Sequence, residues 1–128
     1  MSLHMRLWLT VSLFFVSVTS AVAADVEWPT WRGPNRDAIS TEKGLLKKWP
    51  DEGPKLAWRI DDKLGNGMSS IAISQGKIFT MGRVDGDECV ICLELKDGKE
   101  QWKTELGTQG EPNCTPTVDG ERVYALSR

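Results

Sequence analysis

Two cysteines are the side chains of this chain whose spacing comes nearest to a chemical motif. Cys89 and Cys92 have the Cys-x-x-Cys spacing that redox disulfides and zinc sites use. Both lie in a predicted strand, where residues three apart are separated by about 10 Å and point to opposite faces. A disulfide needs Cα atoms within about 7 Å, and the single histidine, His4, is far away in the sequence. We therefore interpret both as small buried side chains, and the pairing of Cys89, Cys92 and Cys114 stays open.

An acidic run at residues 85–88, Asp-Gly-Asp-Glu, is the second candidate. Carboxylate oxygens are calcium ligands, but this run lacks the longer ligand spacing of an EF-hand loop. Aspartate and glycine together are more typical of a hairpin turn, so we expect a solvated hairpin tip. The residues thus assign no metal ligand, and the catalytic and cofactor-binding residues remain unknown.

The elements that would position such side chains are short β-strands. Apolar residues alternate with polar ones between turn residues such as Gln75-Gly76, Asp97-Gly98 and Asp119-Gly120. No convincing helical pattern lies between them, so the chain is predicted to be all-β. The predicted strands are 56–60, 70–73, 77–81, 89–95, 101–106, 115–118 and 122–126.

Several of these strands recur at a fixed period. Trp58 and Trp102 are 44 residues apart, and Ile78-Phe79 recurs as Val123-Tyr124 after 45 residues. A unit of about 45 residues with four strands is typical of a β-propeller blade. A two-sheet sandwich also has short strands at 8–12-residue spacing and is the alternative fold.

The N-terminus has the pattern of a secretory signal peptide, residues 1–23. Arg6 precedes an apolar run from 7 to 18, and the small residues Ala21-Val22-Ala23 follow. We therefore expect export to the periplasm or beyond the cell, with no membrane anchor after cleavage; an uncleaved membrane helix is the alternative. Sixteen basic and eighteen acidic residues, without a basic cluster, exclude a nucleic-acid-binding footprint.

Residues 24–54 are predicted to be an irregular N-terminal arm. Trp28-Pro29, Gly33-Pro34 and Trp49-Pro50 interrupt regular structure, because proline lacks an amide donor and restricts its predecessor. Trp28, Trp31 and Trp49 are too many aromatic residues for a disordered tail, so we expect the arm to pack on a folded body. Residues 40–48 could form one or two helical turns.

Residues 92–102 resemble the tryptophan-docking motif of the pyrroloquinoline quinone (PQQ) repeat family. Cys92, Glu94, Gly98 and Trp102 occupy its first, third, seventh and eleventh positions, although Cys92 replaces the usual alanine and Asp97 the usual threonine. In that family the tryptophan stacks between adjacent blades. The resemblance therefore implies that these four residues are structural, blade-docking positions.

Residues 28–37 resemble the opening of exported PQQ-like propeller proteins, described as quinoprotein alcohol dehydrogenase-like or polyvinyl-alcohol-dehydrogenase-like. The resemblance implies an incomplete β-propeller over residues 55–128, about one and a half four-stranded antiparallel blades after the arm. Residues 56–60 would then complete the last blade of a ring. Since seven or eight blades need roughly 315–360 residues, we expect a fragment of a longer chain or a truncated reading frame, with the remaining blades as its partners.

Two functions follow from the resemblance. One is a PQQ- and calcium-dependent alcohol dehydrogenase, which needs an aspartate base, calcium ligands and, in many members, adjacent cysteines that stack on the quinone. Cys89 and Cys92 are not adjacent in this sequence. The resemblance therefore implies that the catalytic residues would lie outside this chain. The other is a non-catalytic scaffold that binds proteins, similar to the PQQ-like component of the outer-membrane barrel-assembly machinery. The absence of a lipid-anchor cysteine near residue 23 counts against that particular role.

Overall fold

The computed structural model of this chain describes residues 26–61 and 63–127, so the predicted signal peptide lies outside the described residues. Its regular elements are all strands: β1 (Ala72–Ser74), β2 (Lys77–Val84), β3 (Asp87–Glu94), β4 (Glu100–Glu105), β5 (Thr117–Asp119) and β6 (Arg122–Tyr124). The all-β prediction is confirmed for these residues. Among them no helix is long and apolar enough to cross a membrane.

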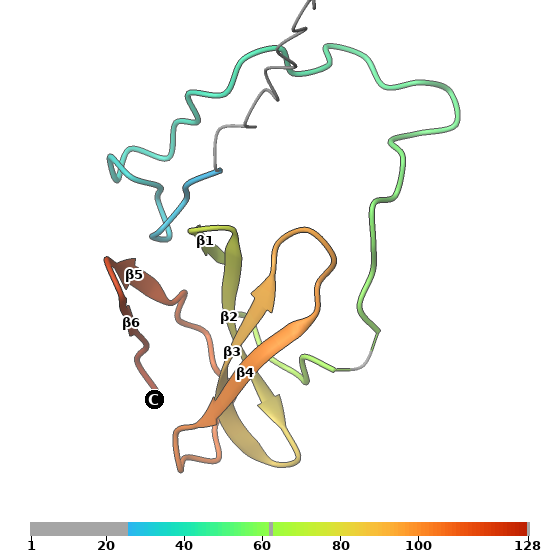
Figure 1. Cartoon of the computed structure of the whole chain (residues 1–128). Helices are drawn as coiled ribbons and strands as arrows, with labels where there is room; N and C mark the ends of the chain where they lie inside the picture. The colour runs from blue at the N-terminus through green and yellow to red at the C-terminus, as the bar shows by residue number, and fades with distance from the viewer. Residues whose placement is uncertain (1–25, 62, 128) are drawn as a thin grey trace, which may run out of the picture.

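Two separate antiparallel sheets make up the fold (Figure 1). The first contains β1, β2, β3 and β4 in that order, and the second is the β5–β6 hairpin. Within each sheet every strand pairs with its neighbour in sequence. Two-residue turns connect β1 to β2 and β2 to β3. Gln75 and Gly76 both have positive φ, 52° and 71°, as do Asp85 and Gly86, 54° and 103°. Positive φ at both central residues matches the twist of a two-residue hairpin.

The β2–β3 hairpin is longer than predicted. β2 continues to Val84 and β3 begins at Asp87, where the sequence predicted strands over 77–81 and 89–95. The tight Asp85-Gly86 turn leaves the flanking residues free to pair, so Val84 and Asp87 are register partners. A β-bulge follows at Cys92/Leu93, opposite β4.

Both faces of the four-stranded sheet are apolar. One face, here called the hairpin face, buries Ala72, Phe79 and Cys92 together with Val118 of β5. The opposite face, here called the arm face, buries a second cluster: Ile78, Cys89, Ile91 and Leu93, with Trp58, Ile60 and Leu64 packed against them. The sheet is therefore the middle of three layers, between the segment that precedes it and the β5–β6 hairpin that follows.

Two predicted elements are absent. Residues 56–60 are not a strand: within the part of the chain that the structure describes, they make no ladder with another segment. Residues 40–48 contain no helical turn; the Glu42 amide instead donates to the Ser40 hydroxyl at 3.2 Å. Such a local side-chain acceptor competes with helix formation.

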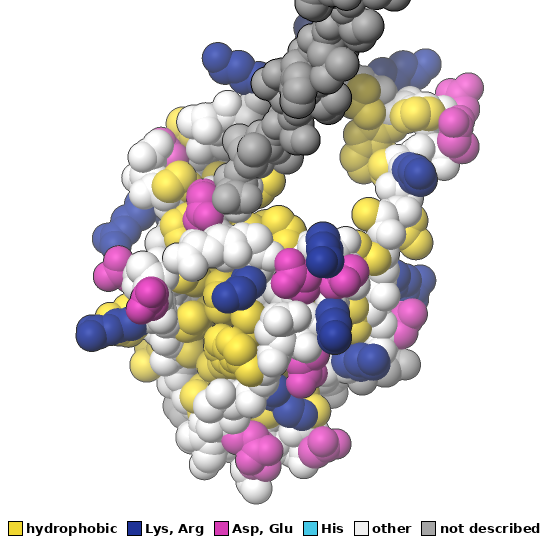
Figure 2. All heavy atoms as spheres, in the orientation of Figure 1, with side chains coloured by type: hydrophobic (Ala, Val, Ile, Leu, Met, Phe, Trp, Pro, Cys, Tyr) yellow, Lys and Arg dark blue, Asp and Glu magenta, His cyan; other side chains and the backbone are white. Residues whose placement is uncertain are grey.

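The arm packs on the body at its start and not along its length. Trp28 is half-buried, but Trp31 and Trp49 are 70% and 62% exposed, so the expectation that all three pack was wrong for these two. Beyond residue 38 the chain runs in a wide curve away from the sheets and returns to them before β1 (Figure 1). Figure 2 shows open space between this curve and the body.

Candidate functional site

The eleven-residue motif forms the end of β3, a closed turn and the start of β4. The Gly98 amide donates to the Glu94 carbonyl at 2.9 Å, and the Glu94 amide donates to the Lys99 carbonyl at 2.8 Å. The Asp97 carboxylate accepts from the Lys99 amide at 3.0 Å. Gly98 has a φ of +70°, a conformation that other residues rarely adopt. Asp97 and Gly98 thus shape the turn, and Glu94 contributes through its backbone.

A tryptophan docks on this turn, and it is Trp58. Its indole N–H donates to the Leu95 carbonyl at 3.0 Å. A Cβ atom built on Gly98 would lie 2.8 Å from the Trp58 ring and 3.1 Å from Ile60. The missing side chain of Gly98 therefore provides the space in which the ring lies, and Leu95 provides its hydrogen-bond acceptor. We call Leu95 and Gly98 the docking notch.

Sequence reasoning missed this contact. It assigned the docking role to Trp102, and it treated Trp58 as part of the predicted strand 56–60 and as one end of a 44-residue spacing. The 44-residue spacing was the available signal, because it relates Trp58 to the tryptophan that follows this turn.

Trp102 lies on the hairpin side of the sheet. It is the register partner of Cys92, and its ring centroid is 6.0 Å from that of Phe79. With Val118 and Val123 it lines a hollow of about 270 Å³ between the sheet and the β5–β6 hairpin. Trp102 is 38% exposed. Among the described residues its indole N–H has no acceptor.

The cysteines lie apart. Cys92 is buried on the hairpin face and Cys89 on the arm face, as the strand geometry predicted, and all three cysteines are free. Burial raises the pKa of the Cys89 and Cys92 thiols, so both are poor nucleophiles at neutral pH. This answers the question of pairing: Cys89, Cys92 and Cys114 form no disulfide in this structure.

The acidic run is not uniformly solvated, which corrects the prediction for its last residue. Asp85 is exposed, but Glu88, the second residue of β3, is completely buried. Its carboxylate accepts from the Thr108 hydroxyl at 2.7 Å and from the Ser127 hydroxyl. Glu88 thus links the sheet to the segment after β6. Among the described residues no three metal-ligating side chains lie together.

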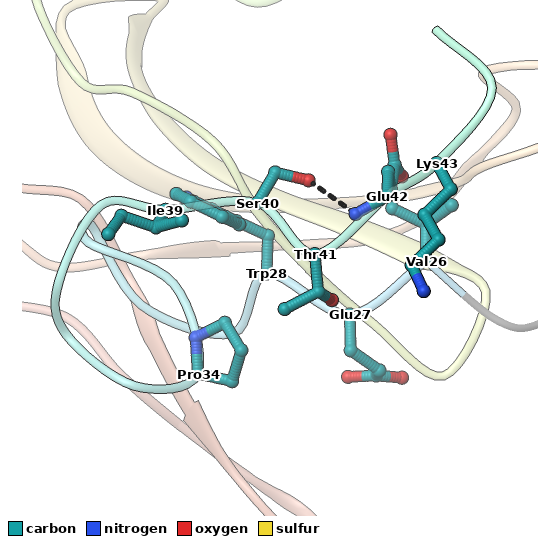
Figure 3. A pocket seen from close by; sticks show the side chains of 9 residues that line it. All are labelled: Val26, Glu27, Trp28, Pro34, Ile39, Ser40, Thr41, Glu42 and Lys43. Atoms are coloured by element: carbon teal, nitrogen blue, oxygen red, sulfur yellow. Dashed lines mark hydrogen bonds between the residues drawn. The ribbon is translucent and has the colours of Figure 1, made fainter.

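A recess of about 500 Å³ lies between residues 26–28 and 39–43 (Figure 3). Two polar side chains in its lining are hydrogen bonded to backbone amides. The Ser40 hydroxyl accepts from the Glu42 amide, and the Glu27 carboxylate accepts from the Gln75 amide at 2.8 Å. The recess therefore presents no nucleophile paired with a base, and the docking notch is the site with the better-defined geometry.

Comparisons with protein-family models, with curated proteins and with solved structures found no match to this chain.

Proposed function

We propose that this chain is an exported PQQ-like β-propeller repeat protein in which the described residues act as a structural scaffold. Its four-stranded sheet would be one blade and the β5–β6 hairpin the start of the next. The blades would stack through tryptophans that dock on the turn of the following unit.

The observation that carries the proposal is the position of Trp58. Residues 92–102 resemble the tryptophan-docking motif of the PQQ repeat, and Trp58 contacts the turn of that same motif through Leu95 and Gly98. Trp58 also precedes Trp102 by 44 residues, close to one repeat. A docked tryptophan one repeat before the motif's own tryptophan is the arrangement that blade stacking requires.

A second support is the matched pairing of the two hairpins. Ile73 pairs with Ile78 in the first hairpin, and Val118 pairs with Val123 in the second. Each residue of the second pair lies 45 positions after its counterpart in the first. In a sandwich whose halves resemble each other only by chance, the two hairpins would have no reason to share one register at a constant offset.

The alternative is a PQQ- and calcium-dependent alcohol dehydrogenase. Since such a dehydrogenase would hold its catalytic residues outside these 128 residues, the product of the full reading frame would be purified, incubated with PQQ and Ca²⁺, and tested for alcohol-dependent reduction of a dye. The scaffold proposal predicts no reduction above the rate without protein. Reduction that requires protein, PQQ and alcohol together would contradict it and support the dehydrogenase.

Export is tested separately by sequencing the N-terminus of the protein recovered from the periplasm or medium. The signal-peptide prediction expects Ala24 as the first residue. Retention of Met1 on membrane-associated protein would instead support an uncleaved helix.

A further inference from the structure

The start of the arm lies between the first strands of the two sheets. Trp28 and Ile73 of β1 exchange two backbone hydrogen bonds, of 2.8 and 2.9 Å. The next residue, Pro29, accepts from the Val118 amide of β5 at 2.8 Å. Adjacent residues of one segment therefore bind two different sheets.

A proline fits the second of these positions. In an extended segment the N–H and C=O of one residue point to the same side, and those of the next residue point to the other. Trp28 turns its donor and acceptor toward β1, and Pro29 turns its carbonyl toward β5. Because proline has no N–H, no donor is left without an acceptor on the β5 side.

Side chains connect the same elements at the adjoining turns. The Glu27 carboxylate accepts from the Gln75 amide in the β1–β2 turn at 2.8 Å. The Gln75 side-chain amide donates to the Gly120 carbonyl in the β5–β6 turn at 3.2 Å. The two turns and the arm thus form one hydrogen-bonded chain.

The loop after Pro29 folds back and holds the Trp28 ring. Gly33 is buried, and a Cβ atom there would lie 2.8 Å from that ring. The Thr30 hydroxyl donates to the Gly33 carbonyl at 2.7 Å, and the Ala38 amide donates to the Arg32 carbonyl at 3.0 Å.

We propose that residues 27–38 are a clasp that fixes the β5–β6 hairpin against β1. When the clasp opens, the hairpin keeps its apolar contact through Val118 and the link between Glu88 and Ser127. The β2–β3–β4 ladders do not involve the clasp and remain paired. The clasp is independent of the proposed function, since it would join the two sheets in a propeller and in a sandwich alike.

Amide hydrogen exchange on the full chain tests this, with Gly33→Ala as the clasp variant. The added methyl group displaces the Trp28 ring, so exchange at Ile73 and Val118 should accelerate about tenfold or more. Ile91 in β3 should exchange as in the parent chain. Gly44→Ala is the matched control: Gly44 has the same φ of +76° as Gly33 and nothing within 4 Å of an added Cβ.

Two outcomes would overturn the proposal. One is unchanged exchange at Ile73 and Val118 in Gly33→Ala. The other is equal acceleration at Ile91, which would make residues 27–38 part of the sheet's cooperative core. Trp28→Ala, which removes the ring instead of displacing it, should accelerate exchange at the same two amides.

Discussion

At the scale of single residues, Trp58 and Trp102, which are 44 residues apart in the sequence, have different surroundings. The Trp58 indole N–H is hydrogen bonded and its ring lies in the docking notch, whereas Trp102 is 38% exposed and rests on Phe79. Apolar area removed from water determines most of what such a ring contributes to stability. Trp58 should therefore contribute more than Trp102, although the motif places Trp102 at its conspicuous last position.

Two substitutions of Trp58 should distinguish the contribution of its ring to stability from the contribution of its hydrogen bond. Trp58→Phe keeps an aromatic ring and removes the donor to Leu95, so the free energy of unfolding should fall by about 1 kcal/mol. Trp58→Ala also empties the notch and should cost about 3 kcal/mol. Urea denaturation measures both. Exposed Trp49 is the control, with an expected change within about 0.5 kcal/mol; equal effects for Trp58→Ala and Trp49→Ala would contradict the docking assignment.

The buried Cys92 thiol should make stability depend on pH in the alkaline range. Burial raises its pKa above the ordinary 9.0, so the folded state keeps a proton that the unfolded state loses. Its contribution is therefore fully present below pH 9.0 and is lost as the pH rises through the raised pKa. Denaturation midpoints between neutral and alkaline pH should decline less steeply in Cys92→Ala. Identical slopes in the two proteins would argue against a buried, protonated thiol.

At the scale of elements, turn chemistry explains which parts of the fold could be predicted. Gln75-Gly76 and Asp85-Gly86 adopt the positive φ values of tight hairpins, so the paired strands beside them follow from local sequence. Glu88 could not be predicted in the same way, because its burial depends on Thr108 and Ser127, which are distant in sequence. Residues 56–60 alternate like a strand, but an edge partner decides whether such a segment pairs.

The docking notch can be tested with two glycines of nearly equal conformation. Gly98 and Gly107 have φ values of +70° and +71°, so an alanine is strained at both, by about 1 kcal/mol. At Gly98 the new Cβ also meets the Trp58 ring at 2.8 Å, whereas at Gly107 nothing lies within 4 Å. Gly98→Ala should therefore cost about 2 kcal/mol more than Gly107→Ala in urea denaturation. Equal costs would mean that the ring does not depend on the notch.

At the scale of the whole molecule, the described residues form three layers, and the proposed clasp joins two of the strands. The four-stranded sheet has an apolar face toward Trp58 and another toward Val118, while residues 27–38 join β1 to β5. Neither the clasp nor the identity of the docked tryptophan could be read from local pattern, since both rest on contacts between segments more than 35 residues apart. The 44-residue spacing did relate Trp58 to Trp102, the tryptophan that follows the turn on which Trp58 lies.

The proposed stacking of repeat units is tested most directly by extending the chain with its own sequence. The register pairs of the two hairpins differ by 45 residues, so residue 128 corresponds to Arg83. A chain with residues 84–127 appended after residue 128 would place a second docking notch beside Trp102. A control carries alanine in place of the appended copy of Gly98.

The measurement is hydrogen exchange at the Trp102 indole N–H. If the sheets are stacking repeat units, this exchange should slow about tenfold or more in the extended chain, because the indole gains an acceptor like the Leu95 carbonyl. The control should show much less slowing. An unfolded appended segment with unchanged Trp102 exchange would contradict the repeat account.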